Sequence, residues 1–245
     1  MRVRQRFAQY ARDLETLPED AVLAYRRGGL HEVWLAVAER YFYRLARWGR
    51  VLVIVQRLDE LREVPPPPGI IIRRATKADL PALVETMSRR EVERFGDYVA
   101  RGRMCFVAWE GERPIGYAWN ADRFSSDMNV TAGPLALPPT ATYLWNVYVV
   151  PRQRSHGVGA ALASARLSMA RDLGFTEGWT MIAPDNHASL RAIAKTAGPH
   201  ARVIGELRYL KLLTRTFGQF HPSVTALGAM DLGATRRFPV AALSE

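Results

Sequence analysis

The chain has 245 residues, of which 48% are apolar, and it contains six tryptophans. This length and composition allow a substantial buried core, so disorder is not the default expectation. The formal net charge of +10 comes almost wholly from arginine, and it permits binding to nucleic acid, to an acidic membrane surface or to a phosphorylated ligand.

Cysteine content and hydropathy narrow the classes further. Cys105 is the single cysteine, which excludes an internal disulfide framework and suits a reducing compartment. It lies in an apolar stretch, so we expect a packed small residue there. No stretch approaches the roughly 20 apolar residues that cross a bilayer, and the N-terminus lacks the apolar segment of a secretory signal. We expect a cytoplasmic protein.

Residues 1–64 form an N-terminal region of unknown role. The pattern predicts a short helix over Leu14–Tyr25, an amphipathic helix over His31–Trp48 and a buried strand over Val51–Val55. The aromatic face of the second helix packs on the core or on a second subunit, which would make a homodimer. Contact with a membrane surface is the alternative for such a basic amphipathic helix.

A proline run marks the clearest boundary in the chain. Pro65–Pro68 and Gly69 favour a stiff extended spacer. We therefore divide the chain into the N-terminal region 1–64, a linker 65–69, a domain 70–213 and a C-terminal tail 214–245.

The domain after the linker alternates strands and helices. Strands are predicted over Ile70–Arg74, Met104–Trp109, Pro114–Trp119, Tyr143–Val150, Phe175–Ile182 and Arg202–Leu213. Helices are predicted over Thr76–Met87, Arg90–Ala100 and Asn186–Thr196, with a further helix between residue 158 and Gly174. Residues 122–141 lack periodicity and are either a surface loop or part of an acceptor site.

The stretch from Tyr143 to Gly174 predicts a cradle for a bulky anion. An apolar strand ends at Pro151, a basic turn follows, and small residues at helical spacing come next. Two glycines in the turn let the backbone approach a ligand. The first amides of the helix and its dipole favour a diphosphate, and two arginines add charge-assisted hydrogen bonds.

The turn resembles the signature of the GCN5-related N-acetyltransferase (GNAT) superfamily. Arg154-x-x-Gly157-x-Gly159 matches its pattern, with the expected strand end at Val149 and Pro151 before it and a helix after it. A later segment that begins Asn186-His187-Ala188-Ser189 also looks like a helix of the family. The resemblance implies an α/β (α+β) fold: a mixed, mostly antiparallel sheet flanked by helices. The N-terminal helical extension that ends in a strand would precede it.

The resemblance also implies acetyl-CoA, or another acyl-CoA, as cosubstrate. The acyl group would move to a primary amine by direct attack, and the acceptor would be a small molecule or a peptide. In the family the fourth and fifth strands separate and the pantetheine arm enters between them. The residues implied for CoA binding are Val147, Val149, Arg152, Arg154, His156, Gly157, Val158, Gly159, Ala160, Asn186 and Ser189.

The catalytic groups are less well defined by the sequence. The tyrosine that often protonates the thiolate in the family corresponds to Ile193 here. Tyr148, Asn146, Ser189 and His187 are the nearest polar candidates. No pair of carboxylates marks a general base, and the scattered histidines have no metal-ligand spacing, so no metal is expected.

Two other functions compete with an acyltransferase. A non-catalytic acyl-CoA-binding module would account for the missing tyrosine. A basic nucleic-acid-binding protein would account for the net charge, but the chain has no long basic run and no basic motif interleaved with aromatic residues, so the nucleic-acid signal is not strong.

Overall fold

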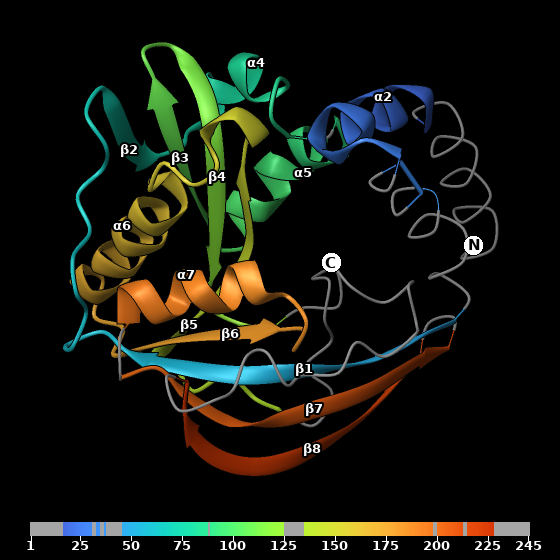
Figure 1. Cartoon of the computed structure of the whole chain (residues 1–245), viewed down its shortest axis with the longest axis vertical. Helices are drawn as coiled ribbons and strands as arrows, with labels where there is room; N and C mark the ends of the chain where they lie inside the picture. The colour runs from blue at the N-terminus through green and yellow to red at the C-terminus, as the bar shows by residue number, and fades with distance from the viewer. Residues whose placement is uncertain are drawn as a thin grey trace.

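A single eight-stranded sheet organises the computed structural model, which describes residues 17–30, 33, 34, 37, 46–87, 89–124, 135–197, 200–212 and 215–227. The strand order is β2-β3-β4-β5-β6-β1-β7-β8, and every neighbouring pair is antiparallel except β5 with β6 (Figure 1). The strands are β1 Ala46–Arg57, β2 Ile70–Arg74, β3 Met104–Glu110, β4 Arg113–Ala121, β5 Ala141–Val149, β6 Glu177–Ile182, β7 Arg202–Leu212 and β8 Arg215–Ala226. This mixed, mostly antiparallel sheet with flanking helices confirms the predicted fold class.

Helices cover both faces of the sheet. They are α2 Leu17–Gly28, α4 Leu80–Leu83, α5 Arg89–Ala100, α6 Val158–Asp172 and α7 His187–Ala197, with short 3-10 turns η1 Lys77–Asp79 and η2 Pro151–Gln153. Strand β3 shows the two faces, because alternate residues of a strand point in opposite directions. Cys105 and Val107 pack towards α4 and α5, whereas Met104 and Phe106 pack towards α6.

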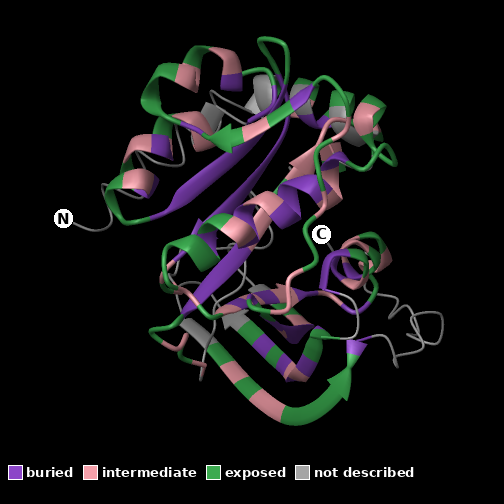
Figure 2. Ribbon diagram, turned by 90° about the vertical axis from the view of Figure 1, so that its left-hand side faces the viewer, coloured by how far each residue is buried: buried purple, intermediate pink, exposed green. Residues whose placement is uncertain are grey.

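The chain from α5 to β7 follows the sequence pattern closely. The hairpin of β3 and β4, the helices α5, α6 and α7, and the strands β5, β6 and β7 all form within a few residues of their predicted ranges. The helix predicted over Thr76–Met87 is shorter, because it is split into η1 and α4 and ends at Leu83. Figure 2 shows that burial is concentrated in the strands at the centre of the sheet and on the side of α6 that faces them.

Strand β1 precedes the proline run in the sequence but belongs to the same sheet as the strands that follow it. It lies between β6 and β7 and is antiparallel to both. Val53 and Ile54 are fully buried, as expected of a continuous apolar stretch that is covered on both faces. The predicted strand Val51–Val55 is therefore confirmed, and it extends over Ala46–Arg57.

The rest of the N-terminal prediction is only partly described. The short helix predicted over Leu14–Tyr25 forms as α2 from Leu17 and continues to Gly28, while residues 14–16 lie outside the described residues. Most of the predicted helix His31–Trp48 lies outside the described residues, and its last three residues belong to β1 instead. Trp48 pairs with Leu210, so hydrogen bonding to β7 extends β1 over this end of the predicted helix.

The linker and the residues just before it lie against α6 (the cyan trace beside α6 in Figure 1). The Val64 amide donates to Ser164 Oγ at 2.8 Å, and Glu63 accepts from Arg171 at 2.8 Å and from Ser168 at 3.1 Å. Pro67 lies beside the turn that precedes α6, because a Cβ added to Gly157 would be 3.8 Å from the Pro67 ring. Segments on both sides of the linker thus share one sheet, and the division into separate folding units stays a prediction.

The region after β7 contains a strand that the sequence pattern did not indicate. Strand β8 pairs with β7 over most of its length and forms one edge of the sheet. It lies in the segment assigned to a tail, where glycine and proline interrupt the alternation of polar and apolar residues. Among the described helices, none is both long and apolar enough to cross a membrane.

Candidate functional site

The predicted anion cradle forms at the end of β5. After η2 the chain turns at Gly157, whose φ of 87° places it in the left-handed region, and α6 begins at Val158. The first intrahelical bond runs from the Ala161 amide to the Gly157 carbonyl. The amides before Ala161 have no acceptor within the helix and are directed at the space in front of it. The structure therefore brings the predicted turn residues 156–160 together at one helix N-terminus.

The two arginines of the turn have different neighbours. Arg154 donates from Nε to the Val149 carbonyl at 3.1 Å and its guanidinium lies 5.9 Å from the centre of the Tyr148 ring. Arg152 lies 3.8 Å from a Glu110 carboxylate oxygen. Arg154 is thus fixed over the end of β5, beside the turn, whereas Arg152 is directed towards β3.

Next to this turn, β5 and β6 separate. They pair only over Ala141–Tyr143 and Glu177–Trp179. One further bond, from Thr180 Oγ1 to the Leu144 carbonyl at 3.0 Å, lies just beyond the last pair. From there to Val149, β5 pairs with β4 alone, and its other edge is open. We call this opening between β5 and β6 the fork.

A bulge in β5 explains why the strands separate. Asn146 has a φ of 47°, which is rare for a residue other than glycine, and the register of β4 against β5 shifts between Tyr117 and Trp119. Such a bulge bends a strand away from its neighbour. Val147, which follows the bulge, is 46% exposed. The two residues predicted to contact pantetheine, Val147 and Val149, therefore lie along the open edge.

A carboxylate of α5, on the face of the sheet opposite α6, contacts the bulge. Asn146 Nδ2 donates to Glu91 Oε1 at 2.5 Å, and the Tyr117 hydroxyl donates to both Glu91 oxygens at 3.2 and 3.3 Å. The Tyr148 ring lies 5.6 Å from the ring of Tyr117. Two of the predicted catalytic residues, Asn146 and Tyr148, thus lie in one cluster with Glu91.

Glu91 was not among the residues that the sequence analysis selected. It lies in the first turn of α5 and precedes Phe95 and Tyr98 by four and seven residues, a spacing that places the three on one side of a helix. Phe95 and Tyr98 are buried. A glutamate in line with a buried aromatic stripe was the signal that could have identified it.

The α7 residues approach from the β6 side of the fork. Asn186 Oδ1 accepts a hydrogen bond from the Ser189 amide at 3.0 Å, which caps the first turn of α7. The position of the tyrosine in the family is occupied by Ile193, which is 7% exposed and packs with Leu190. Asn186 and Ser189 therefore have defined places at the start of α7, and Ile193 belongs to the core.

Cys105 is a further candidate nucleophile, and the structure buries it. Cys105 is 1% exposed, and burial raises the pKa of its thiol well above the usual value, so it is not a thiolate nucleophile. Within the described ranges, no group of three or more His, Cys, Asp or Glu side chains could hold a metal ion.

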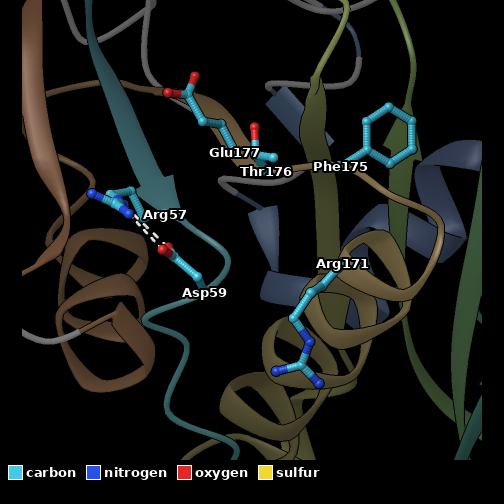
Figure 3. Close-up of a pocket in the computed structure, with 6 residues that line it drawn as sticks. All are labelled: Arg57, Asp59, Arg171, Phe175, Thr176 and Glu177. Atoms are coloured by element: carbon cyan, nitrogen blue, oxygen red, sulfur yellow. Dashed lines mark hydrogen bonds and ion pairs between the residues drawn. The ribbon is translucent and has the colours of Figure 1, made fainter.

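A cleft of about 440 Å³ lies at the opposite end of α6 from the glycine turn. Figure 3 shows the six side chains that line it, Arg57, Asp59, Arg171, Phe175, Thr176 and Glu177. Its charges are compensated within the chain, because Arg57 pairs with Asp59 and Arg171 pairs with Glu63. The unpaired amides lie at the turn before α6 and the open strand edge lies at the fork, and together they form the candidate functional site.

Comparison with known families identifies the family of the chain. The profile of the acetyltransferase (GNAT) family matches residues 72–198, more than half of the chain. The chain therefore belongs to the GNAT family. The matched range includes the bulged strand, the glycine turn and α7, but it excludes β1, β7 and β8.

Solved structures show the same fold. A Drosophila protein is similar at 15% identity and a TM-score of 0.50, over 73% of this chain and 56% of its own. This chain thus spans little more than half the length of that relative. A ribosomal-protein-alanine N-acetyltransferase from Brucella melitensis (22% identity, 51% of this chain and 82% of its own, TM-score 0.39) is also similar. So is an aminoglycoside acetyltransferase from an uncultured soil sample, in complex with sisomicin (17%, 51% and 86%, 0.39). No curated protein matches the chain significantly.

Proposed function

We propose that this protein is an N-acyltransferase that moves an acetyl or other acyl group from acyl-CoA to a primary amine. The observation that supports this most strongly is the juxtaposition of three parts: unpaired amides at a helix N-terminus, an open strand edge, and a carboxylate at the strand bulge. A diphosphate, an extended amide-bearing arm and an amine need these three parts in that order.

The residues of the turn and the fork fit acyl-CoA. The amides of His156, Gly157, Val158, Gly159 and Ala160 would hold the diphosphate, because the helix dipole and free N–H groups favour an anion there. The guanidinium of Arg154 lies beside the turn and adds a charge-assisted hydrogen bond, while Arg152 is near enough to contribute after leaving Glu110. The backbone of Val147 and Val149 would pair with the arm.

Acyl-CoA supplies a thioester whose carbonyl carbon is open to attack by a neutral amine. Glu91 would accept the proton that the amine loses, directly or through one water. Tyr117 and Asn146 hold the Glu91 carboxylate in place by donating hydrogen bonds to it. A backbone amide at the bulge would stabilise the oxyanion, which in other acyl transfers contributes about 3–4 kcal/mol.

The carbon–sulfur bond breaks as the amide forms, and the departing thiolate needs a proton. Tyr148 is the proposed donor, because its ring lies at the bulge next to Tyr117 and the guanidinium of Arg154 lies over it. Ser189 would face the sulfur from α7 on the other side of the fork. Asn186 would then serve the arm as well as capping α7.

The acceptor is proposed only as a class. Glu91 suits a primary amine that attacks in its neutral form, since one carboxylate can accept the single proton that the nitrogen loses as the amide forms. Relatives named for aminoglycosides and for ribosomal-protein alanine are consistent with small-molecule and peptide amines. A cytoplasmic location and a homodimer remain predictions from the sequence.

A turnover assay tests the proposal. The full chain is incubated with acetyl-CoA and a panel of primary amines, including aminoglycosides, polyamines and peptides with a free N-terminus, and release of the CoA thiol is measured. We expect amine-dependent release with at least one class. CoA binding without release for any amine would instead support a non-catalytic acyl-CoA-binding module.

A further inference from the structure

The closed end of the fork is sealed by a side chain. Tyr143 is the last β5 residue that pairs with β6, and the next link is the hydrogen bond from Thr180 Oγ1 to the Leu144 carbonyl at 3.0 Å. Thr180 is 6% exposed and Leu144 is 1% exposed. A threonine side chain therefore closes the fork immediately beyond the last backbone pair.

The sheet is close-packed next to Thr180 on the side of the closed end of the fork. Gly178, two residues earlier in β6, lies on the same face of the sheet as Thr180. A Cβ added to Gly178 would lie 2.8 Å from Leu167 and 3.1 Å from Leu144. These leucines belong to a buried cluster with Leu58. A group that reached past Thr180 would have to displace close-packed leucines.

The direction of a bound acyl-CoA follows from the two ends of the fork. The glycine turn lies at the open end, after Val149, and would hold the diphosphate. The arm can then run only towards the closed end, along the six residues from Val149 to Leu144, whose five steps span roughly 17 Å in a strand. The acyl group, at the far end of the arm, would meet Thr180 and Leu144.

We propose that Thr180 and Leu144 form the floor of the acyl pocket and restrict the donor to short acyl chains, acetyl and propionyl. This inference rests on the proposed function. A chain of six carbons would have to enter the space that the leucines fill. In a closed apolar pocket, one methylene of misfit changes selectivity by about 10-fold to 200-fold.

Calorimetric titration tests this without a known acceptor. CoA, acetyl-CoA, butyryl-CoA and hexanoyl-CoA are titrated into the full chain. We expect acetyl-CoA to bind at least about tenfold more tightly than hexanoyl-CoA. Thr180→Ala removes the floor and narrows that ratio by about tenfold. Thr180→Ser, which keeps the hydroxyl and removes one methyl, narrows it partly and serves if the alanine variant is unstable.

Two further variants separate the volume of the Thr180 side chain from its hydroxyl group and from a general effect of truncating a threonine. Thr180→Val keeps the shape and should keep the wild-type ratio. Thr176→Ala is the same truncation outside the fork, on an exposed residue before β6, and should change nothing. Equal affinity of the wild type for acetyl-CoA and hexanoyl-CoA, or a wild-type ratio in both Thr180→Ala and Thr180→Ser, would overturn this inference alone. Failure of the wild type to bind any of the four ligands would overturn the proposed function and this inference together.

Discussion

Gly157 is the residue whose backbone conformation sets the direction of the free amides. Its φ of 87° costs a residue with a side chain about 1–2 kcal/mol, and the turn can relieve that strain by moving its amides. We predict that Gly157→Ala lowers the affinity for CoA by about fivefold to thirtyfold, measured by calorimetric titration.

Gly174 is the matched control for this substitution. Its φ of 89° imposes the same backbone strain on an alanine and nothing lies within 4 Å of an added Cβ, but it lies at the other end of α6, so Gly174→Ala should keep the wild-type affinity. Wild-type affinity in Gly157→Ala would contradict the placement of the diphosphate at this turn.

Glu91 is the residue that the proposed proton transfer depends on. Gln preserves its shape and removes its basicity, so Glu91→Gln should lower kcat by about 100-fold or more and leave CoA affinity unchanged. Glu93→Gln, an exposed position on the same helix, should leave both unchanged. Steady-state kinetics with a reactive amine measures kcat, and a wild-type kcat in Glu91→Gln would assign the base elsewhere.

The contrast between these two residues shows what sequence can predict at this scale. Gly157 belongs to a local pattern of six residues, so its position was predictable. Glu91 acquires its role from Tyr117 and Asn146, 26 and 55 residues away. No local spacing records a contact that the sheet and α5 create only after folding.

Strand β1 is the element on which the sheet depends although it precedes the proline run. Ile54 is fully buried between β6 and β7, so Ile54→Ala should lower the free energy of unfolding by about 2–5 kcal/mol. Ile71→Ala on the edge strand β2, where the side chain is 65% exposed, should cost no more than about 0.5 kcal/mol. Urea denaturation measures both.

A truncated chain provides the stricter test of the same point. A chain that begins at residue 58 lacks the strand between β6 and β7 and should fail to fold. If it folds cooperatively and binds CoA, the domain after the linker is independent of β1.

The start of η1 is held by one carboxylate. Asp79 accepts from Arg73 at 2.6 and 2.9 Å and from the Thr76 amide at 2.7 Å. The Arg73 guanidinium is the main cause that lowers the Asp79 pKa from 3.8 to about 2. A depressed pKa means that this stabilisation is complete above about pH 4 and is lost as the pH falls towards 2.

Asp79→Asn should therefore lower the free energy of unfolding by about 1 kcal/mol at pH 7, since Arg73 is partly exposed. The difference from the wild type should shrink as the pH falls from 4 to 2. Urea denaturation at pH 7 and pH 2.5 checks this, and a difference that stays constant would show that the ion pair contributes nothing.

Elements were predictable where their signals are local. The strand, turn and helix from β5 to α6 carry a proline, two glycines and clear periodicity, and they form as expected. Strand β8 carries Gly218 and Pro222, which weaken a strand pattern, and it forms because β7 offers a partner edge. The place of β1 between β6 and β7 depends on pairing over more than 100 residues, which periodicity does not contain.

At the scale of the whole molecule, the fork results from several distant segments acting together. The bulge at Asn146 separates β5 from β6, Thr180 closes the gap, and the turn after β5 places free amides at its mouth. The family match covers residues 72–198, yet β6, which forms one side of the fork, is paired on its other side by β1 from outside that range. We therefore expect the candidate site to need the N-terminal strand as well as the matched segment.

The most direct test of the central claim is amide hydrogen exchange of the full chain with and without acetyl-CoA. We expect acetyl-CoA to slow exchange in the peptides that cover residues 145–160, where the open edge of β5 and the turn lie. Unchanged exchange in those peptides, with protection instead around the cleft at residues 171–177, would contradict acyl-CoA binding at the turn and the fork.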